Sequence, residues 1–277
     1  MQSLVKCILV CGLSLCAAGP ALGANDWIAD EDLADMAANP KLRAVDLSHA
    51  HISDRGLLYL RPATRVTSLD LRWAEQIGDE GLAYLKDWRA LTSINLHGTK
   101  ITDTATTYLA NMAELAAVDV GFARVTDAGL SFLMRLKNLQ TLVIGGNRIT
   151  STGLQSLRTF AALVTLDLGG QQRTDSGLWS VQVDDDAIAA ITSLPKLRKI
   201  RLFALPITDA QVARLLTLPA LEQLDLSGCP ALTDAVLDVL SAAKGLRWLN
   251  LAGTKLSIQA VERFRQKRPD LELIAGP

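Results

Sequence analysis

Apolar and polar positions recur along the chain with a period of 24 or 25 residues. Residues 115–138 read LAAVDVGFARVTDAGLSFLMRLKN, and residues 139–162 read LQTLVIGGNRITSTGLQSLRTFAA. Equivalent units open at Leu42, Val66, Leu91, Leu115, Leu139, Leu163, Leu197, Leu221, Leu246 and Leu271. A fixed period in this range predicts a solenoid in which each unit packs on its neighbours.

Each unit divides into two halves with different periods. The first half alternates apolar and polar residues, as in Leu69-Asp70-Leu71, which predicts a short strand with one buried face. The second half places apolar residues three and four apart, as in Leu82 and Leu85, which predicts one buried helical face. No unit can bury both faces alone. We therefore expect one parallel sheet that is covered by an outer layer of helices and curves with the sheet inside.

An aspartate opens the helical half of most units. A carboxylate at this point is suited to be the helix N-cap, because it can accept a hydrogen bond from a backbone N–H that has no partner in the helix. The residues expected to do so are Asp54, Asp79, Asp103, Asp127, Asp209 and Asp234.

The unit resembles the leucine-rich repeat family. It is similar to the subgroup with units LxxLxLxx(C/T/N)xxITDxGLxxL, which is found in bacterial proteins and in F-box substrate receptors. The resemblance covers residues 28–274 and implies an α/β fold, a right-handed horseshoe with a concave parallel sheet and convex helices. It implies little about function, because this architecture serves many binding tasks.

The first 24 residues differ from the repeats. Lys6 precedes an uncharged apolar stretch, Cys7 to Ala18, and small residues follow up to Ala24. This order predicts a secretory signal peptide over residues 1–24, and hence a periplasmic or secreted protein; the alternative is an uncleaved membrane anchor. The remainder, residues 25–277, is expected to be a single leucine-rich-repeat domain of about ten units. It begins with a half-repeat cap at Ile28.

One unit carries ten extra residues. The spacing from Leu163 to Leu197 is 34, and Val183 takes the helix-opening position 15 residues after Leu168. Residues 169–182 are therefore expected to leave the solenoid as an insertion between strand and helix. Since aromatic and arginine side chains are favoured at interfaces, Arg173 and Trp179 are candidate binding residues. The alternative is a neutral insertion that packs Trp179 against its own repeat.

The outward strand positions form a column that is mostly acidic. Asp119, Asp167 and Asp225 are candidates for attracting a basic partner, and the alternative is that these aspartates serve solubility only. Arg201 replaces the usual aspartate of one strand, and Phe203 replaces a small residue there. Together with the insertion, we expect these two residues to form the main contact surface.

Composition and motifs narrow the functional classes. The net charge is −1 and no basic stripe is evident in the sequence, so nucleic acid is not an expected partner. The motifs of hydrolases, zinc proteases and P-loop enzymes are absent. Cys229, the one cysteine outside residues 1–24, is expected to be a buried thiol. His49, His51, Trp73 and His97 form a second polar and aromatic patch, for which we expect surface contacts rather than metal binding. No metal or cofactor is expected.

Three functions remain open. The first is an exported, non-catalytic and monomeric scaffold that binds a protein through the concave face and the 169–182 loop, without stable membrane insertion after signal cleavage. The second is a substrate receptor or effector related to F-box adaptors, which is disfavoured because only Asn25 to Ile28 would precede the repeats. The third is a receptor for a small ligand or a cell-wall glycan, or an enzyme whose active site is assembled across repeats.

Overall fold

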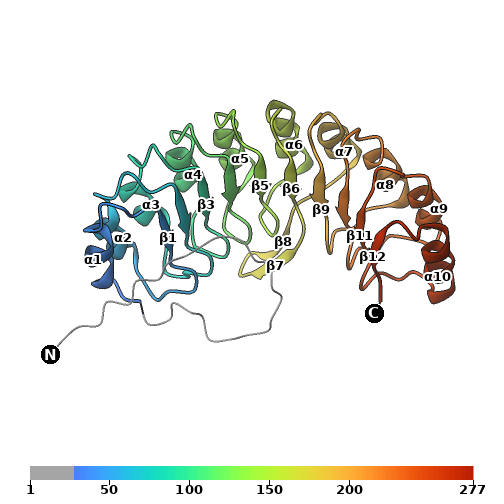
Figure 1. Cartoon of the computed structure of the whole chain (residues 1–277), viewed down its shortest axis with the longest axis horizontal. Helices are drawn as coiled ribbons and strands as arrows, with labels where there is room; N and C mark the ends of the chain where they lie inside the picture. Colours follow the sequence, from blue (N-terminus) through green and yellow to red (C-terminus); the bar gives the residue numbers. More distant parts are fainter. Residues whose placement is uncertain (1–27, 277) are drawn as a thin grey trace.

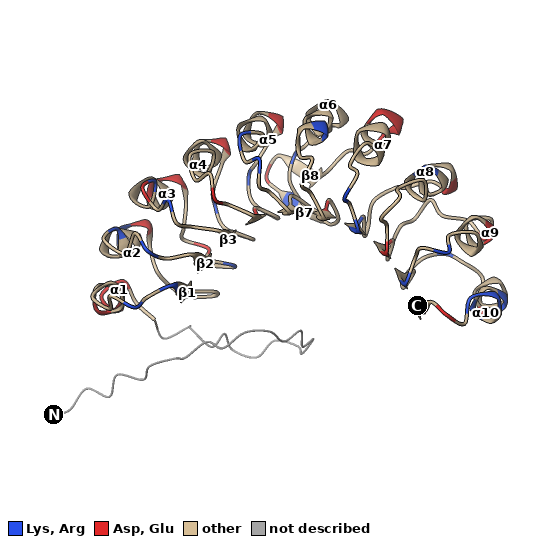
Figure 2. Ribbon diagram, turned by 45° about the horizontal axis from the view of Figure 1, so that its top comes forward, with Lys and Arg blue, Asp and Glu red and all other residues tan. Residues whose placement is uncertain are grey.

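The repeats build an arch with one strand and one helix in each unit (Figure 1). The computed structural model describes residues 28–276. Strands line the inner rim of the arch and helices its outer rim (Figure 2). Ten strands form one parallel sheet in the order β1-β2-β3-β4-β5-β6-β9-β10-β11-β12. The predicted α/β solenoid with a concave sheet and convex helices is confirmed.

The sheet strands are three residues long. They are β1 Ala44–Asp46, β2 Ser68–Asp70, β3 Ser93–Asn95, β4 Ala117–Asp119, β5 Thr141–Val143, β6 Thr165–Asp167, β9 Lys199–Arg201, β10 Gln223–Asp225, β11 Trp248–Asn250 and β12 Glu272–Ile274. The helices are α1 Asp32–Ala37, α2 Asp54–Leu60, α3 Asp79–Tyr84, α4 Asp103–Leu109, α5 Asp127–Leu133, α6 Ser151–Leu154 followed by a 3-10 helix at Gln155–Thr159, α7 Asp185–Thr192, α8 Asp209–Leu215, α9 Val236–Ser241 and α10 Ile258–Lys267.

The insertion leaves the sheet uninterrupted. β6 pairs directly with β9, with Leu166 opposite Ile200, and the extra residues form a separate antiparallel hairpin. Its strands are β7, Gln171–Thr174, and β8, Gly177–Ser180. The predicted loop is therefore an ordered hairpin that projects from the turn after β6.

The apolar positions stack into one continuous core. In the second repeat, Leu69, Leu71 and Ile77 are at most 1% exposed, as are the helix residues Leu82 and Leu85. Each repeat buries these side chains against the next one, which is where the stability of a solenoid lies. No helix among residues 28–276 is long and apolar enough to cross a membrane.

The last helix turn of the array is closed by a buried arginine. Arg268 is 6% exposed and follows α10 directly. Its guanidinium donates hydrogen bonds to the carbonyl oxygens of Leu240, Ala243 and Leu246, and it also pairs with Asp270. Arg268 thereby satisfies carbonyls at the end of α9, which a helix cannot pair internally.

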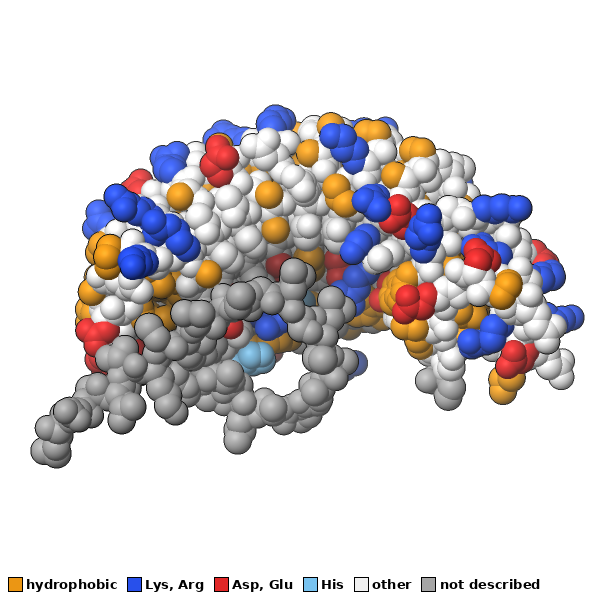
Figure 3. All heavy atoms as spheres, in the orientation of Figure 1, with side chains coloured by type: hydrophobic (Ala, Val, Ile, Leu, Met, Phe, Trp, Pro, Cys, Tyr) orange, Lys and Arg blue, Asp and Glu red, His pale blue; other side chains and the backbone are white. Residues whose placement is uncertain are grey.

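Basic side chains gather along the upper rim of the arch in Figure 3. The loops that run from helix to strand contribute exposed cations to this edge: Arg61, Arg65, Lys86, Arg89, Arg135 and Lys137. Cations near helix C-termini are favoured by the helix dipole.

The expectation that the repeat aspartates are N-caps is wrong. In α4 and α5 the N-caps are Thr102 and Thr126, and Asp103 and Asp127 are the first helical residues. The carboxylate of Asp103 instead reaches the next repeat, where it accepts hydrogen bonds from the backbone N–H of Thr126 at 2.7 Å and from its hydroxyl at 2.6 Å.

This bridge recurs at most junctions between helices. The donor and acceptor residues lie 23 or 24 positions apart in the sequence. The pairs are Asp30 with Ser53, Asp54 with Gly78, Asp79 with Thr102, Asp103 with Thr126, Asp127 with Thr150, Asp209 with Thr233 and Asp234 with Ser257. We call this series the carboxylate ladder.

The glycine of the helical half makes room for the ladder. A Cβ atom on Gly129 would lie 2.3 Å from Oδ1 of Asp103, and one on Gly153 would lie 2.1 Å from Oδ1 of Asp127. Glycine therefore occurs here because a neighbouring carboxylate lies against it.

The ladder is interrupted beside the insertion. Ser151 stands where other repeats have aspartate, and its hydroxyl donates to the carbonyl of Gln182 and accepts from the N–H of Asp184. At the following junction Asp185 accepts instead from the side chain of Gln211. The two junctions after α5 thus use weaker and different links.

Replacing Asp103 by alanine tests the ladder. We expect Asp103→Ala to lower the free energy of unfolding by about 1–3 kcal/mol, because the half-buried N–H of Thr126 loses its acceptor. Asp103→Asn keeps one acceptor oxygen and should cost less. Urea unfolding measures the effect, with Glu114→Ala, an exposed position, as the control. Equal unfolding midpoints for Asp103→Ala and the control would exclude a stabilising ladder.

Candidate functional site

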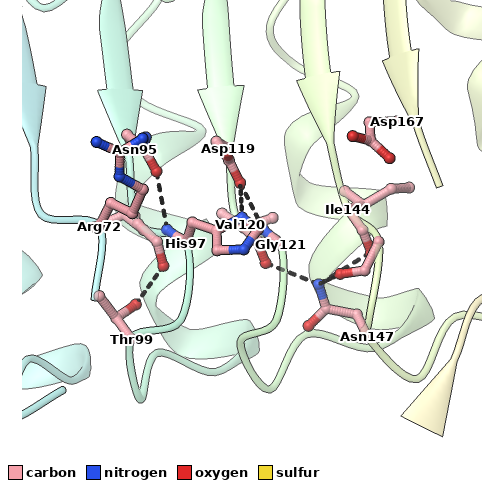
Figure 4. A network of polar contacts seen from close by, with 12 residues as sticks. Arg72, Asn95, His97, Thr99, Asp119, Val120, Gly121, Ile144, Asn147 and Asp167 are labelled. Carbon is pink, nitrogen blue, oxygen red and sulfur yellow. Dashed lines mark hydrogen bonds and ion pairs between the residues drawn. The ribbon is translucent and has the colours of Figure 1, made fainter. Parts of the chain in front are cut away.

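The acidic column of the concave face has a structural role in each strand. The outward Asp or Asn accepts a hydrogen bond from the backbone N–H two residues further on, which ties down the turn after the strand. These acceptors are Asp46, Asp70, Asn95, Asp119, Asp167, Asp225 and Asn250. Figure 4 shows two of these bonds, from His97 to Asn95 and from Gly121 to Asp119. Val143 and Arg201 hold this position without such a bond.

Arg201 brings four of the predicted site residues together. Its Nη1 lies 3.0 Å from Oδ2 of Asp167 on one side, and its Nε lies 3.5 Å from Oδ2 of Asp225 on the other. The guanidinium carbon lies 5.2 Å from the centre of the Phe203 ring, within range of a cation–π contact. The Arg201 side chain is itself about half exposed, so a partner can still reach it.

Asp167 is almost fully buried beneath this arginine. It is 5% exposed, and burial raises the pKa of its carboxyl group to about 6, while Arg201 and the N–H of Gly169 act in the opposite direction. A carboxylate with this environment titrates near physiological pH.

Phe203 connects this cluster to the hairpin. A Cβ atom on Gly169 would lie 2.2 Å from the Phe203 ring, so the ring lies directly against the backbone after β6. The next residue, Gly170, has φ +94° and lies beneath the end of the Phe122 ring, which comes from two repeats earlier. The hairpin thus starts between two aromatic rings.

Two glutamines anchor the hairpin to the solenoid. Nε2 of Gln172 donates to the carbonyl oxygens of Ala123 at 2.7 Å and of Gly146 at 2.6 Å. Nε2 of Gln171 donates to the carbonyl oxygen of Ala204 at 2.9 Å. These bonds hold the hairpin beside the turns after β4, β5 and β9.

The two faces of the hairpin differ in exposure. Gln172 pairs with Trp179 and Arg173 pairs with Leu178, so each pair shares one face. Trp179 is half-buried on the same face as the anchor Gln172, and its indole N–H donates to Ser176. Arg173 is exposed and Leu178 is 60% exposed on the opposite face. The outward surface therefore consists of Arg173 with Leu178, which the sequence did not single out.

The hairpin contains a second copy of the letters that open a helix elsewhere. Thr174 to Leu178 read TDSGL, but Arg173 precedes them where the repeats have a buried Ile or Val. Without that apolar anchor the segment forms a turn, in which Gly177 adopts φ +116°.

Asp119 lies apart from the Arg201 cluster. Its Oδ1 lies 3.2 Å from Nδ1 of His97. The His97 ring packs between Trp73, with ring centres 5.2 Å apart, and Phe122, with ring centres 5.0 Å apart. Asp119 thus belongs to a second, aromatic cluster on β2 to β4 and their turns.

Several of these aromatic residues share one backbone position. In the turn after each strand, one residue adopts a left-handed φ near +60°, which costs a non-glycine residue about 1–2 kcal/mol. Most repeats have glycine there; the exceptions are His49, Trp73, Phe122 and Ala204. Phe122 was missed from the sequence, although an aromatic residue where other repeats have glycine was a usable signal.

Neither histidines nor cysteine form a reactive centre. Within residues 28–276 no group of three His, Cys, Asp or Glu side chains could hold a metal. Cys229 is fully buried, its Sγ donates to the carbonyl oxygen of Leu202, and burial raises the pKa of the thiol to about 11. The predicted buried thiol is confirmed.

Comparison with known proteins identifies the repeat. The sequence profile of the leucine rich repeat family matches residues 38–60, 64–86 and 135–157. With one strand per repeat in a ten-stranded parallel sheet, the chain is a leucine-rich-repeat protein. Proteins of this class commonly serve as interaction scaffolds, and they are typically not enzymes. No curated protein matches the chain.

Solved structures with a similar course include two internalins of Listeria monocytogenes. Internalin C2 is 21% identical, with 80% of this chain and 74% of that chain covered and a TM-score of 0.44. The internalin InlF is 17% identical, with 90% and 84% covered and a TM-score of 0.48. The assignment to the class rests on the repeats and the sheet, not on these two likenesses.

The buried carboxyl group of Asp167 predicts a pH dependence of stability. Its pKa is higher in the folded than in the unfolded chain, so the fold binds more protons between about pH 4 and pH 6. The free energy of unfolding should therefore fall by about 3 kcal/mol as the pH rises through this window. Carbon-13 NMR of the carboxyl group should show a midpoint near 6.

The arginine supplies the control for this measurement. Arg201→Gln should raise the Asp167 midpoint further, because the guanidinium favours the ionised form. Arg198→Gln, which removes an ion pair with Glu222, should leave it unchanged. A wild-type midpoint near 4 would contradict the assignment of a desolvated carboxyl group.

Proposed function

We propose that this protein is an exported, non-catalytic and monomeric scaffold that binds a protein partner beside the hairpin. The binding surface consists of Arg201 and Phe203 on the concave face together with Arg173 and Leu178 on the outer face of the hairpin. Trp179 and Asp167 support this surface from beneath, and Asp225 pairs with Arg201 at its far side. The export signal of this proposal, residues 1–24, lies outside the described residues.

The observation that carries the proposal is the anchored hairpin. A neutral insertion would need no fixed position, whereas Gln171 and Gln172 donate three hydrogen bonds to turns of three different repeats. The result is a fixed platform that exposes a leucine and an arginine. Exposed apolar and arginine side chains on a rigid support are typical anchors of protein interfaces.

The chemistry of the surface favours a protein with acidic and apolar groups. Arg201 is half exposed, and its carboxylate partners hold it in place from below, so it can offer its remaining donors. Leu178 supplies apolar area close to Arg173. The proposed absence of catalysis fits a surface with no nucleophile or free histidine beside these residues.

Site-specific crosslinking tests the proposal. A photoreactive amino acid at position 178 of the full-length protein should crosslink one defined protein from periplasmic and secreted extracts. The same group at Phe132, 36% exposed on the convex helix α5, is the matched control and should not crosslink that protein. Adding Arg201→Gln should weaken the crosslink about tenfold, because a desolvated arginine contact is lost.

A second variant separates loss of the surface from loss of the fold. Deleting Gln171 to Ser180 restores the regular spacing of 24 and should leave a folded solenoid that no longer captures the partner. Capture that is equal for the deletion variant and the complete chain would refute binding at the hairpin.

A further inference from the structure

A row of three unpaired cations lies on the edge of the arch where the strands end. Lys100, Arg124 and Arg148 occupy the same position in three consecutive repeats, and all three are exposed. None of them forms a side-chain hydrogen bond or an ion pair with any residue from 28 to 276. The sequence showed no basic stripe, because its members lie 24 residues apart.

The backbone holds this row in a fixed register. The N–H groups of Lys100, Arg124 and Arg148 donate to carbonyl oxygens of the preceding repeats. Bridges of parallel strand type join Thr102 to Arg124 and Thr126 to Arg148. The cations therefore follow one another at about 4.8 Å, the spacing of paired strands.

Neighbouring carboxylates do not neutralise the row. The nearest row of acids along the chain, Asp79, Asp103 and Asp127, belongs to the carboxylate ladder. The oxygens of these acids already accept hydrogen bonds from Thr102, Thr126 and Thr150. Lys100, Arg124 and Arg148 remain available to an external anion.

The row begins at a pocket that contains an exposed aromatic ring. This pocket has a volume of about 450 Å³ and is lined by His49, His51, Trp73, Glu75, Gln76 and Lys100. Trp73 is 40% exposed and lies against Gly98, since a Cβ atom there would be 2.3 Å from its ring. Trp73 also has the unfavourable left-handed φ of +58°. Strained aromatic residues of this kind concentrate at functional sites.

At its other end the row reaches the foot of the hairpin. Gln172 bonds the carbonyls of Ala123 and Gly146, which directly precede Arg124 and Asn147 in the chain. The pocket, the cations and the hairpin thus form one continuous edge that is distinct from the Arg201 surface.

We propose that this edge binds an acidic polysaccharide in extended form. One carboxylate on each sugar would meet one cation on each repeat. The apolar face of a sugar ring would stack on Trp73, while Gln76, Glu75 and the histidines offer both donors and acceptors to hydroxyl groups. A site of this volume and mixed polarity suits one or two sugar rings. The site goes beyond the protein-binding function proposed above.

Calorimetric titration of the full-length protein with short polygalacturonate oligomers tests the proposal. We expect binding that weakens with salt, and no binding of the methyl-esterified oligomers, which keep the rings but lack the charge. Replacing Lys100, Arg124 and Arg148 together by serine should weaken binding about tenfold. The matched control replaces Arg65, Lys86 and Arg135 by serine; it changes the net charge equally on the opposite edge and should bind as the wild type does.

Trp73→Gly distinguishes loss of the site from loss of the fold. Glycine is the residue of most other repeats at this position, so this variant should raise the midpoint of thermal unfolding while it weakens oligomer binding. The hairpin deletion should retain oligomer binding, which separates this test from that of the protein partner.

Three outcomes would overturn the proposal. They are the absence of polygalacturonate binding at low salt, an equal loss in the two serine triple variants, and tighter binding of single-stranded DNA of matched charge. Unchanged binding by Trp73→Gly would overturn the contact with the sugar ring.

Discussion

Every repeat of this chain can bury its leucines only against the next repeat. That single constraint fixes the register of ten strands and thereby the position of all other side chains. Residues that are 24 or 25 positions apart become neighbours at about 4.8 Å, and each position of the repeat becomes a row. The insertion obeys the same constraint, because it leaves from a turn and lets β6 pair directly with β9.

Aspartates in two rows stabilise the array in different ways. On the concave face, Asp119 and its equivalents bond the turn of their own repeat. On the convex side, Asp103 and its equivalents bond the next repeat. The concave aspartates keep a second oxygen, and Arg201 uses two of these oxygens to fix its own position. A single departure in a regular row therefore creates a cluster without any change in the backbone.

Much of the fold could be predicted from the sequence, because strand and helix halves repeat with their own periods. The number of strands, the curvature and the place of the insertion followed from the spacing of Leu163 and Leu197. The role of the helix-opening aspartates could not be predicted, since the partner of each carboxylate lies in another repeat. The site was predicted in part: Arg201 does join Phe203, Asp167 and Asp225, whereas Asp119 pairs with His97. Phe122 and Leu178 were missed because their exposure depends on turn conformation and on hairpin pairing.

The interruption of the carboxylate ladder at Ser151 divides the convex layer into two cooperative blocks. Helices α1 to α6 are linked by five carboxylate bridges, and α8 to α10 by two more. In a linear array the coupling between neighbours sets how far local unfolding spreads. Opening that starts at the C-terminal end is therefore expected to stop near α7, next to the hairpin. The molecule then has a mechanical seam at the repeat that carries its most irregular surface, so a partner bound across this seam would join the two blocks.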